Sequence, residues 1–198
     1  MKRFALAAAA LSALAVRGRA QIAFRPGGSL RIEGDSSLHK WGSTATVVSM
    51  TFQPADGAPK TLAEAITASK ITSLEVRIPV AGLRSGESGL DKNMRKAMRA
   101  QEFPDIVYRL ERYELTKGAS EGVMAAKIEG RLTIAEQTKP VTIDVEFRAG
   151  PNGPVVKGSY RLKMSDYGIT PPTLMLGAIK TRDPVTIRFD LLLTPQQE

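Results

Sequence analysis

Two serines of this chain lie in glycine-containing strings that could carry nucleophilic catalysis. Ser120 is at the centre of Gly-Ala-Ser-Glu-Gly at residues 118–122, which fits the pattern G-x-S-x-G. Ser36 lies in a second string, Gly-Asp-Ser-Ser-Leu at residues 34–38. A serine nucleophile needs a base, most often histidine, within hydrogen-bond reach of its hydroxyl. The chain has a single histidine, His39, so one imidazole would have to serve either serine.

Neither string meets the remaining requirements of a hydrolase. Residues 34–38 are similar to the serine block of the GDSL lipases, but the Asp-x-x-His that these enzymes carry near the C-terminus is missing from the sequence. Ser120 is expected in a turn between two strands, whereas a nucleophile elbow requires a turn from a strand into a helix. We therefore predict no catalytic residues and no enzyme activity.

His39 could also serve as a ligand of a metal or a haem. One imidazole without cysteines and without a neighbouring carboxylate cluster makes a poor site, and the chain has no cysteine. His39 lies close to Trp41, the only tryptophan, and we expect it to make a structural hydrogen bond at one end of the fold. No glycine-rich phosphate loop joins a strand to a helix. The sequence therefore predicts neither a metal nor a cofactor.

The N-terminus has the three parts of a secretory signal peptide. Lys2 and Arg3 give a charged start, residues 4–16 an apolar stretch, and Gly18 and Ala20 the small residues of a cleavage site. The apolar stretch is too short to span a bilayer as a helix. We predict that residues 1–20 are a signal peptide, cleaved near Ala20, and that the protein is periplasmic or secreted.

Cleavage would change the charge of the protein and leave one domain. Residues 1–20 contain four cations and no acid, so the formal net charge would fall from +8 to +4. The remaining cations are dispersed, whereas nucleic-acid-binding proteins gather them on one face, so we expect no nucleic-acid partner. No linker or repeat divides residues 21–198, which we predict to be a single domain. Arg17 and Arg19 beside the cleavage site leave an uncleaved anchor as the alternative.

Apolar and polar residues alternate along most of this domain, which is typical of strands with one buried face. The clearest examples are residues 127–134 and 141–148, which we expect to form a hairpin through the polar connection 135–140. The pattern recurs at 30–32, 44–52, 74–80, 106–110, 160–164 and 185–193, which gives about eight strands. These observations predict an all-β antiparallel barrel or sandwich. Residues 61–70 are ambiguous between helix and strand.

One helix is expected before Pro104. Ser88 and Asp91 resemble an N-cap pair, and an apolar stripe recurs every four residues at Leu90, Met94 and Met98. The opposite face carries a continuous basic stripe, made of Lys92, Arg95, Lys96 and Arg99. This stripe is either a solvated helix face or a surface that contacts the headgroups of an anionic membrane.

Five strings, in order along the chain, resemble the YceI-like family of lipocalin-like, polyisoprenoid-binding proteins. They are residues 35–41 (Asp-Ser-Ser-Leu-His-Lys-Trp), residues 78–83 leading into 90–94, residues 102–108 (Glu-Phe-Pro-Asp-Ile-Val-Tyr), residues 130–134 with 138–141, and residues 165–169 (Ser-Asp-Tyr-Gly-Ile). The resemblance covers nearly all of residues 21–198. The chain departs from simpler members in its first string and in an inserted stretch around residues 54–70.

The resemblance implies an eight-stranded antiparallel lipocalin-like barrel with a short helical lid and an elongated cavity for an isoprenoid or another long-chain lipid. The residues that we expect to line it are mostly medium-sized aliphatics and methionines, which suit a slender hydrocarbon. They are Trp41, Leu74, Val76, Ile78, Met94, Met98, Phe103, Tyr108, Leu132, Ile143, Val145, Phe147, Leu162, Met164 and Phe189. The alternative is a barrel with a filled core that acts as a periplasmic protein-interaction or stress-related module without a lipid.

Overall fold

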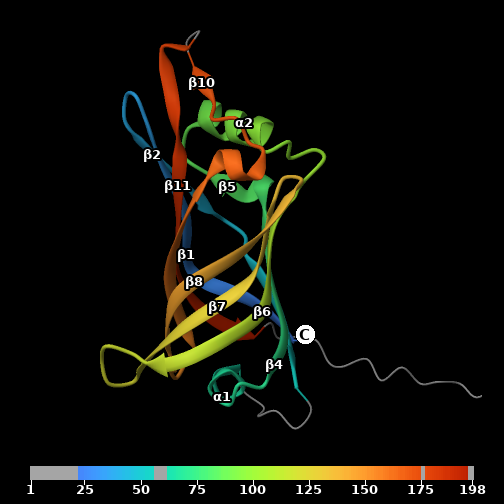
Figure 1. Cartoon of the computed structure of the whole chain (residues 1–198), viewed down its shortest axis with the longest axis vertical. Helices are drawn as coiled ribbons and strands as arrows, with labels where there is room; N and C mark the ends of the chain where they lie inside the picture. The colour runs from blue at the N-terminus through green and yellow to red at the C-terminus, as the bar shows by residue number, and fades with distance from the viewer. Residues whose placement is uncertain (1–21, 56–61, 175–176, 196–198) are drawn as a thin grey trace, which may run out of the picture.

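The computed structural model describes residues 22–55, 62–174 and 177–195 of the chain. The predicted signal peptide at residues 1–20 lies outside these ranges. Over the described residues, all strands belong to one antiparallel sheet that curls into an elongated barrel (Figure 1). The all-β architecture predicted from the alternation of apolar and polar residues is therefore confirmed.

Eleven strands are present in the described part of the chain. Their bounds are β1 Ile22–Ser36, β2 Lys40–Ala45, β3 Ser49–Pro54, β4 Ile71–Pro79, β5 Leu83–Arg84, β6 Asp105–Lys117, β7 Val123–Ile134, β8 Gln137–Arg148, β9 Val155–Lys163, β10 Thr173–Leu174 and β11 Ile179–Pro195. Two α-helices, α1 Leu62–Thr67 and α2 Ser88–Ala97, and two short 3₁₀ helices, η1 Val80–Gly82 and η2 Met164–Tyr167, complete the elements.

Eight of the strands close the barrel, as predicted. Their order around the ring is β11-β9-β8-β7-β6-β4-β3-β1, and β1 pairs with β11 from Phe24 to Ser36 to complete the circle. The other three are short or outside the ring: β2 and β5 continue the sheet beyond the upper half of β1, and β10 pairs with β11. The described part of the chain thus has eleven strands rather than eight, because the sequence pattern did not predict β2, β5 and β10 as separate strands.

Alternation determines which side chains enter the barrel. Along β8 every second residue from Val141 to Phe147 is buried and the residues between them are exposed, so one face of the strand makes the inner wall. The predicted hairpin of β7 and β8 is present, but its loop is shorter than residues 135–140, because Ile134 pairs with Gln137. The predicted strand at 44–52 is divided between β2 and β3, and Val80 lies in η1 rather than in β4.

The two helices lie at opposite ends of the barrel, with α2 near β5 and β10, and α1 near the lower end of β4 (Figure 1). Residues 62–67, in the segment with an ambiguous pattern, are therefore helical. Helix α2 ends at Ala97, before Pro104, because Arg99 adopts a positive φ of 50°. The Ala100 N–H then donates to Arg95 O at 3.0 Å, which is the hydrogen bond that closes a Schellman motif.

The predicted N-cap pair of α2 is wrong. The N-cap residue is Glu87, which makes no side-chain hydrogen bond to the helix. The buried carboxylate of Asp91 instead accepts hydrogen bonds from the Ser85 hydroxyl at 2.7 Å and the Ser85 N–H at 2.8 Å. These two hydrogen bonds lower the pKa of Asp91, and they tie the first turn of α2 to the segment that follows β5.

A β-bulge interrupts β6. The register with β7 shifts between Leu110 and Arg112, so Glu111 and Arg112 both face outward. Each has an ion-pair partner on β7: Arg112 Nε lies 2.7 Å from Glu129 and Arg131 Nε lies 2.8 Å from Glu111. The extra residue reverses the parity of the strand beyond it. Inward positions are even-numbered before the bulge and odd-numbered after it.

Two aromatic rings of the inner wall rest against glycines of neighbouring strands. A Cβ built on Gly158 would lie 2.6 Å from Cζ of Phe189, and one built on Gly130 would lie 2.9 Å from Cε2 of Tyr108. Real Cβ atoms do not approach other atoms so closely. The bare backbone of each glycine therefore gives the ring space beside the wall, so that it does not have to project toward the axis.

Replacement of Gly158 by alanine should push the Phe189 ring away from the wall. We expect Gly158→Ala to lower the free energy of unfolding by about 1–3 kcal/mol, the usual cost of overpacking, as measured by urea denaturation. Gly27→Ala is the matched control, because its Cβ would meet nothing closer than 3.9 Å. Equal stability of the two variants would contradict the proposed steric role of Gly158.

Candidate functional site

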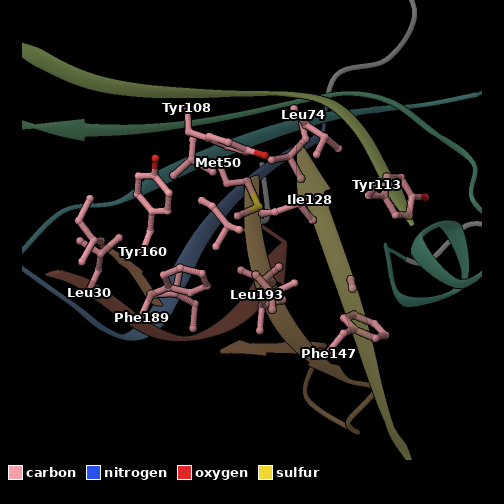
Figure 2. Close-up of a pocket in the computed structure, with 18 of the residues that line it drawn as sticks. Leu30, Met50, Leu74, Tyr108, Tyr113, Ile128, Phe147, Tyr160, Phe189 and Leu193 are labelled. Carbon is pink, nitrogen blue, oxygen red and sulfur yellow. The ribbon is translucent and has the colours of Figure 1, made fainter. Parts of the chain in front are cut away.

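The barrel encloses an apolar cavity of about 180 Å³. By the same measure a single water molecule needs roughly 10–15 Å³, so the space could hold a chain of many atoms. Side chains from all eight ring strands and from α1 face it, and almost all of them are aliphatic or aromatic. Figure 2 shows Leu30, Tyr160 and Phe189 toward one end of this cavity and Tyr113 at the other, next to α1.

Nine of the fifteen residues predicted to contact a ligand line this main cavity. They are Leu74, Val76, Ile78, Tyr108, Leu132, Ile143, Val145, Phe147 and Phe189. They come from β4, β6, β7, β8 and β11, and the closed ring brings them together although they are up to 115 positions apart in the sequence. Their placement is due to the alternation that predicted the strands.

A smaller cavity of about 80 Å³ lies at the α2 end and is lined by five further predicted residues: Trp41, Met94, Met98, Leu162 and Met164. Leu90 joins Met94 and Met98 in its lining, so the predicted apolar stripe of α2 does face the barrel. Asn93 and Thr181 also line this cavity. The α2 end therefore offers an amide and an aliphatic hydroxyl group, whereas the polar side-chain groups in the lining of the main cavity are the tyrosine hydroxyls.

Two isoleucines line both cavities. Ile106 on β6 and Ile187 on β11 appear in the wall of each, and their strands lie four places apart in the ring of eight. They therefore face each other from opposite sides of the barrel, at the boundary between the two spaces. A long ligand that occupies both cavities would pass between these two side chains.

Phe103, the remaining predicted residue, lines neither cavity. It is half-buried beside α2, and the Arg99 guanidinium lies over its ring at 4.6 Å from the centroid, a cation–π contact. Arg99 also makes an ion pair with Glu136 at 2.6 Å. The ion pair of Arg99 and Glu136 ties the end of α2 to the turn between β7 and β8. Contact of Phe103 with a ligand stays a prediction.

Sequence reasoning missed the residues that close the main cavity at its α1 end. They are Ile66, Ile71, Tyr113 and Leu115. Tyr113 and Leu115 follow the bulge of β6, where the inward parity changes, so a simple extension of the alternation from Ile106 would place them outside. The signal that could have found them is the consecutive pair of charged residues, Glu111 and Arg112, which breaks the alternation in the sequence.

The Tyr108 hydroxyl is buried in the wall without a hydrogen-bond partner among the described residues. It rests against Gly130, where a Cβ would lie 2.8 Å from the oxygen. Burial in these apolar surroundings raises the pKa of the Tyr108 phenol, with a smaller contribution from the charges of Glu111 and Glu129. An unpaired buried hydroxyl costs free energy, so the ring and not the hydroxyl carries the packing role of this residue.

The two serines considered as nucleophiles have other surroundings. The Ser36 hydroxyl donates to His39 O at 2.8 Å and accepts from the His39 N–H at 3.1 Å, so it stabilises the turn between β1 and β2. Nδ1 of His39 lies 2.8 Å from Lys40 O, which accepts its proton. Ser120 lies between β6 and β7, in the expected strand-to-strand turn.

Residues 22–55, 62–174 and 177–195 contain no group of three or more histidine, cysteine, aspartate or glutamate side chains that could hold a metal ion. No helix formed by these residues is long and apolar enough to cross a membrane.

Comparison with known families agrees with this architecture. The sequence model of the YceI-like domain matches residues 30–193, which is most of the chain. The chain belongs to the YceI-like family. The match begins within β1 and ends within β11, so it includes all or part of each of the eight strands that surround both cavities in this YceI-like protein.

Solved structures share the fold at low sequence identity. A polyisoprenoid binding domain from Saccharophagus degradans has a TM-score of 0.65 at 12% identity and covers 88% of this chain and 99% of its own. BcnA of Burkholderia cenocepacia has a TM-score of 0.62 at 16% identity, with 83% and 94% covered. The YCEI protein of Campylobacter jejuni has a TM-score of 0.54 at 15% identity and covers both chains completely. Among curated proteins, none matches the sequence significantly.

Substitution of Tyr108 by phenylalanine tests whether the hydroxyl contributes to stability. We expect Tyr108→Phe to retain or slightly raise the free energy of unfolding at neutral pH, because the phenol has no protein partner to lose. The pKa of the Tyr108 phenol is about 10 in the unfolded chain and higher in the folded protein. The unfolded state therefore ionises first, and the free energy of unfolding falls as the pH rises above 10. The variant should therefore show a shallower loss of stability there, measured by denaturation at pH 7 to 11. A clear loss of stability at pH 7 would contradict this reading.

Proposed function

We propose that this YceI-like protein holds an isoprenoid or another long-chain apolar lipid inside its barrel and performs no covalent chemistry. The observation that supports it is the elongated apolar cavity, continued toward α2 by the second space behind Ile106 and Ile187. A barrel with a filled core, the alternative considered from the sequence, does not fit an interior with about 180 Å³ of free space. The printed description of the Saccharophagus degradans domain as polyisoprenoid-binding is in line with this proposal.

Burial of hydrocarbon would supply the driving force for binding. At roughly 0.8 kcal/mol per buried CH₂ group, a chain of about twelve carbons gains on the order of 10 kcal/mol before entropic and desolvation costs. Affinity would therefore depend mainly on the length of chain inside the barrel. The polar groups at the α2 end, Asn93 and Thr181, would orient the head of the molecule.

Export is part of the proposal. Residues 1–20 have the composition of a signal peptide, and the chain has no cysteine that would need a particular redox environment. A periplasmic or secreted protein would meet lipids at a membrane surface, where a water-filled space separates donor and acceptor. An apolar cavity inside the barrel is suited to keeping a lipid chain away from that water.

We further propose that the basic face of α2 contacts anionic headgroups. Lys92 and Lys96 are exposed, Arg95 is half-buried, and none of the three makes an ion pair within the described residues. Arg99, the fourth member of the predicted stripe, differs from them because it is already paired with Glu136 and stacked on Phe103. The contact would therefore depend on Lys92, Arg95 and Lys96, and it would bring the smaller cavity next to the bilayer.

Native mass spectrometry of protein purified from its own cells tests lipid binding. We expect one lipid per chain in the wild type and its loss in Ile128→Trp, because Ile128 faces the main cavity and a larger ring there would fill it. Ile128→Leu, which keeps the side-chain volume, is the control and should retain the lipid. A wild-type protein that carries no lipid and takes up none when fed long-chain lipids would contradict the proposal.

Sedimentation with anionic vesicles tests the contact through α2. Reversal of Lys92, Arg95 and Lys96 to glutamate should weaken adhesion at least about tenfold, because each cation near such a surface contributes about 1 kcal/mol. The control is reversal of Lys117, Lys127 and Arg161, which are exposed on other parts of the barrel and carry the same charge. Equal adhesion of the two variants would exclude a specific role of α2.

A further inference from the structure

Helix α1 closes the main cavity at the end opposite to α2. Leu62 and Ala65 are buried, with exposed fractions of 5% and 0%, and Ile66 faces the cavity directly. Tyr113 and Leu115 of β6 and Ile71 at the start of β4 surround the same end. The floor of the cavity is therefore a helix packed across the barrel, and it is apolar on the side that faces the interior.

Tyr113 holds this helix in place. Its hydroxyl donates to Ile66 O at 3.2 Å and lies 3.5 Å from Ala65 O. The same two carbonyls accept from Ser69 N–H at 3.0 Å and from Lys70 N–H at 2.8 Å, which ends the helix in a compact turn. The last turn of α1 is thus tied to β6 through Tyr113 as well as to its own chain.

The bulge of β6 makes this contact possible. Without the extra residue at Glu111 and Arg112, the inward parity of Ile106 and Tyr108 would continue and the side chain of Tyr113 would face outward. The ion pairs of Arg112 with Glu129 and of Glu111 with Arg131 fit a bulge at this position. Three separate features, the bulge, the phenol and the helix, therefore contribute to one end of the cavity.

We propose that α1 is a fixed stop that selects ligands by the length of a single hydrocarbon tail. The inference rests on the proposed lipid binding and adds an orientation to it. Among the described residues that line the cavity at the α1 end, the only polar group is the Tyr113 hydroxyl, which already donates to Ile66 O. The α2 end offers Asn93 and Thr181 in the lining and cations on the helix. The ligand is accordingly a single-chain amphiphile whose tail points toward α1.

The distance from the isoleucine pair to the stop gives the scale of the tail. Ile106 and Tyr113 are seven positions apart on β6, which corresponds to about 15–18 Å along the axis at about 3.3 Å per residue, a tilt of about 40° and one bulge. An extended alkyl chain advances about 1.3 Å per carbon, given bonds of about 1.5 Å. About 12–14 carbons therefore fit between Ile106 and α1.

Binding of a series of saturated fatty acids, from about 12 to about 22 carbons, tests the stop. For the wild type we expect affinity to rise up to about fourfold per carbon, to reach a maximum, and to fall by about tenfold over the next few carbons because the cavity cannot take more volume. Ile66→Ala should move the maximum by about three carbons to longer chains, the number of carbons removed from the side chain. Ile66→Trp should move it to shorter chains.

Two further variants separate the stop from the rest of the cavity. Val76→Ala also enlarges the cavity but from β4, where Val76 pairs with Tyr108, so it should change affinity without moving the maximum. Tyr113→Phe keeps the volume and removes the hydrogen bonds to α1, so it should broaden the maximum toward longer chains while the shorter ones bind as before. Circular dichroism melting of each variant establishes that it is folded.

The outcomes distinguish the two proposals. If the wild type binds no fatty acid of any length and retains no cellular lipid, lipid binding itself fails. If it binds them but the maximum stays in place in both Ile66 variants, or moves equally in Val76→Ala, lipid binding stands and the role of α1 as a stop is wrong.

Discussion

The internal cavity of this protein exists because a ring of eight hydrogen-bonded strands encloses more volume than the side chains that point into it occupy. The inward residues are mainly leucine, isoleucine and valine, with few large rings, and two of those rings rest beside Gly130 and Gly158 on the wall. Backbone pairing from β1 through β11 fixes the circumference, so the wall cannot collapse onto the space without loss of sheet hydrogen bonds. The proposed lipid binding depends on this difference between the width of the ring and the volume of the side chains inside it.

The bulge of β6 shows how a local irregularity changes the function of a whole strand. On the outside it leaves two neighbouring charges, Glu111 and Arg112, which find partners on β7. On the inside it turns Tyr113 toward α1, where the phenol reaches the last carbonyls of the helix. A tyrosine hydroxyl is protonated at neutral pH and can donate, and burial raises the pKa of the Tyr113 phenol further above its ordinary value. One inserted residue thereby links the outer charges to the closure of the cavity.

The sequence predicted the regular part of this arrangement and failed where the chain breaks its own period. Leu132 and Ile143 could be assigned to the cavity because every second residue of a strand faces the same side. Tyr113 could not, because the bulge reverses that side, and α1 could not, because the sequence did not decide between helix and strand at residues 61–70. Phe103, which belongs to a family string, lies outside both cavity linings because it precedes β6 and does not share the alternation of that strand. The turn consists of Ala135 and Glu136 alone, because the polar residues 137–140 assigned to the connection are exposed positions of β8, where Pro140 is tolerated.

The two ends of the barrel differ in what they can do with a bound molecule. At the α1 end, the apolar face of the helix is tied to β6 through Tyr113, and the cavity lining described there is aliphatic apart from this engaged phenol. At the α2 end, the helix presents methionines to the interior and lysines to the outside, and methionine side chains adapt readily to different shapes. In the proposed lipid-binding role, a ligand that entered tail first through the α2 end would lose water from its chain as it passed Ile106 and Ile187. Its head would remain near the cations of α2, so the distribution of polar groups favours entry and release at this end.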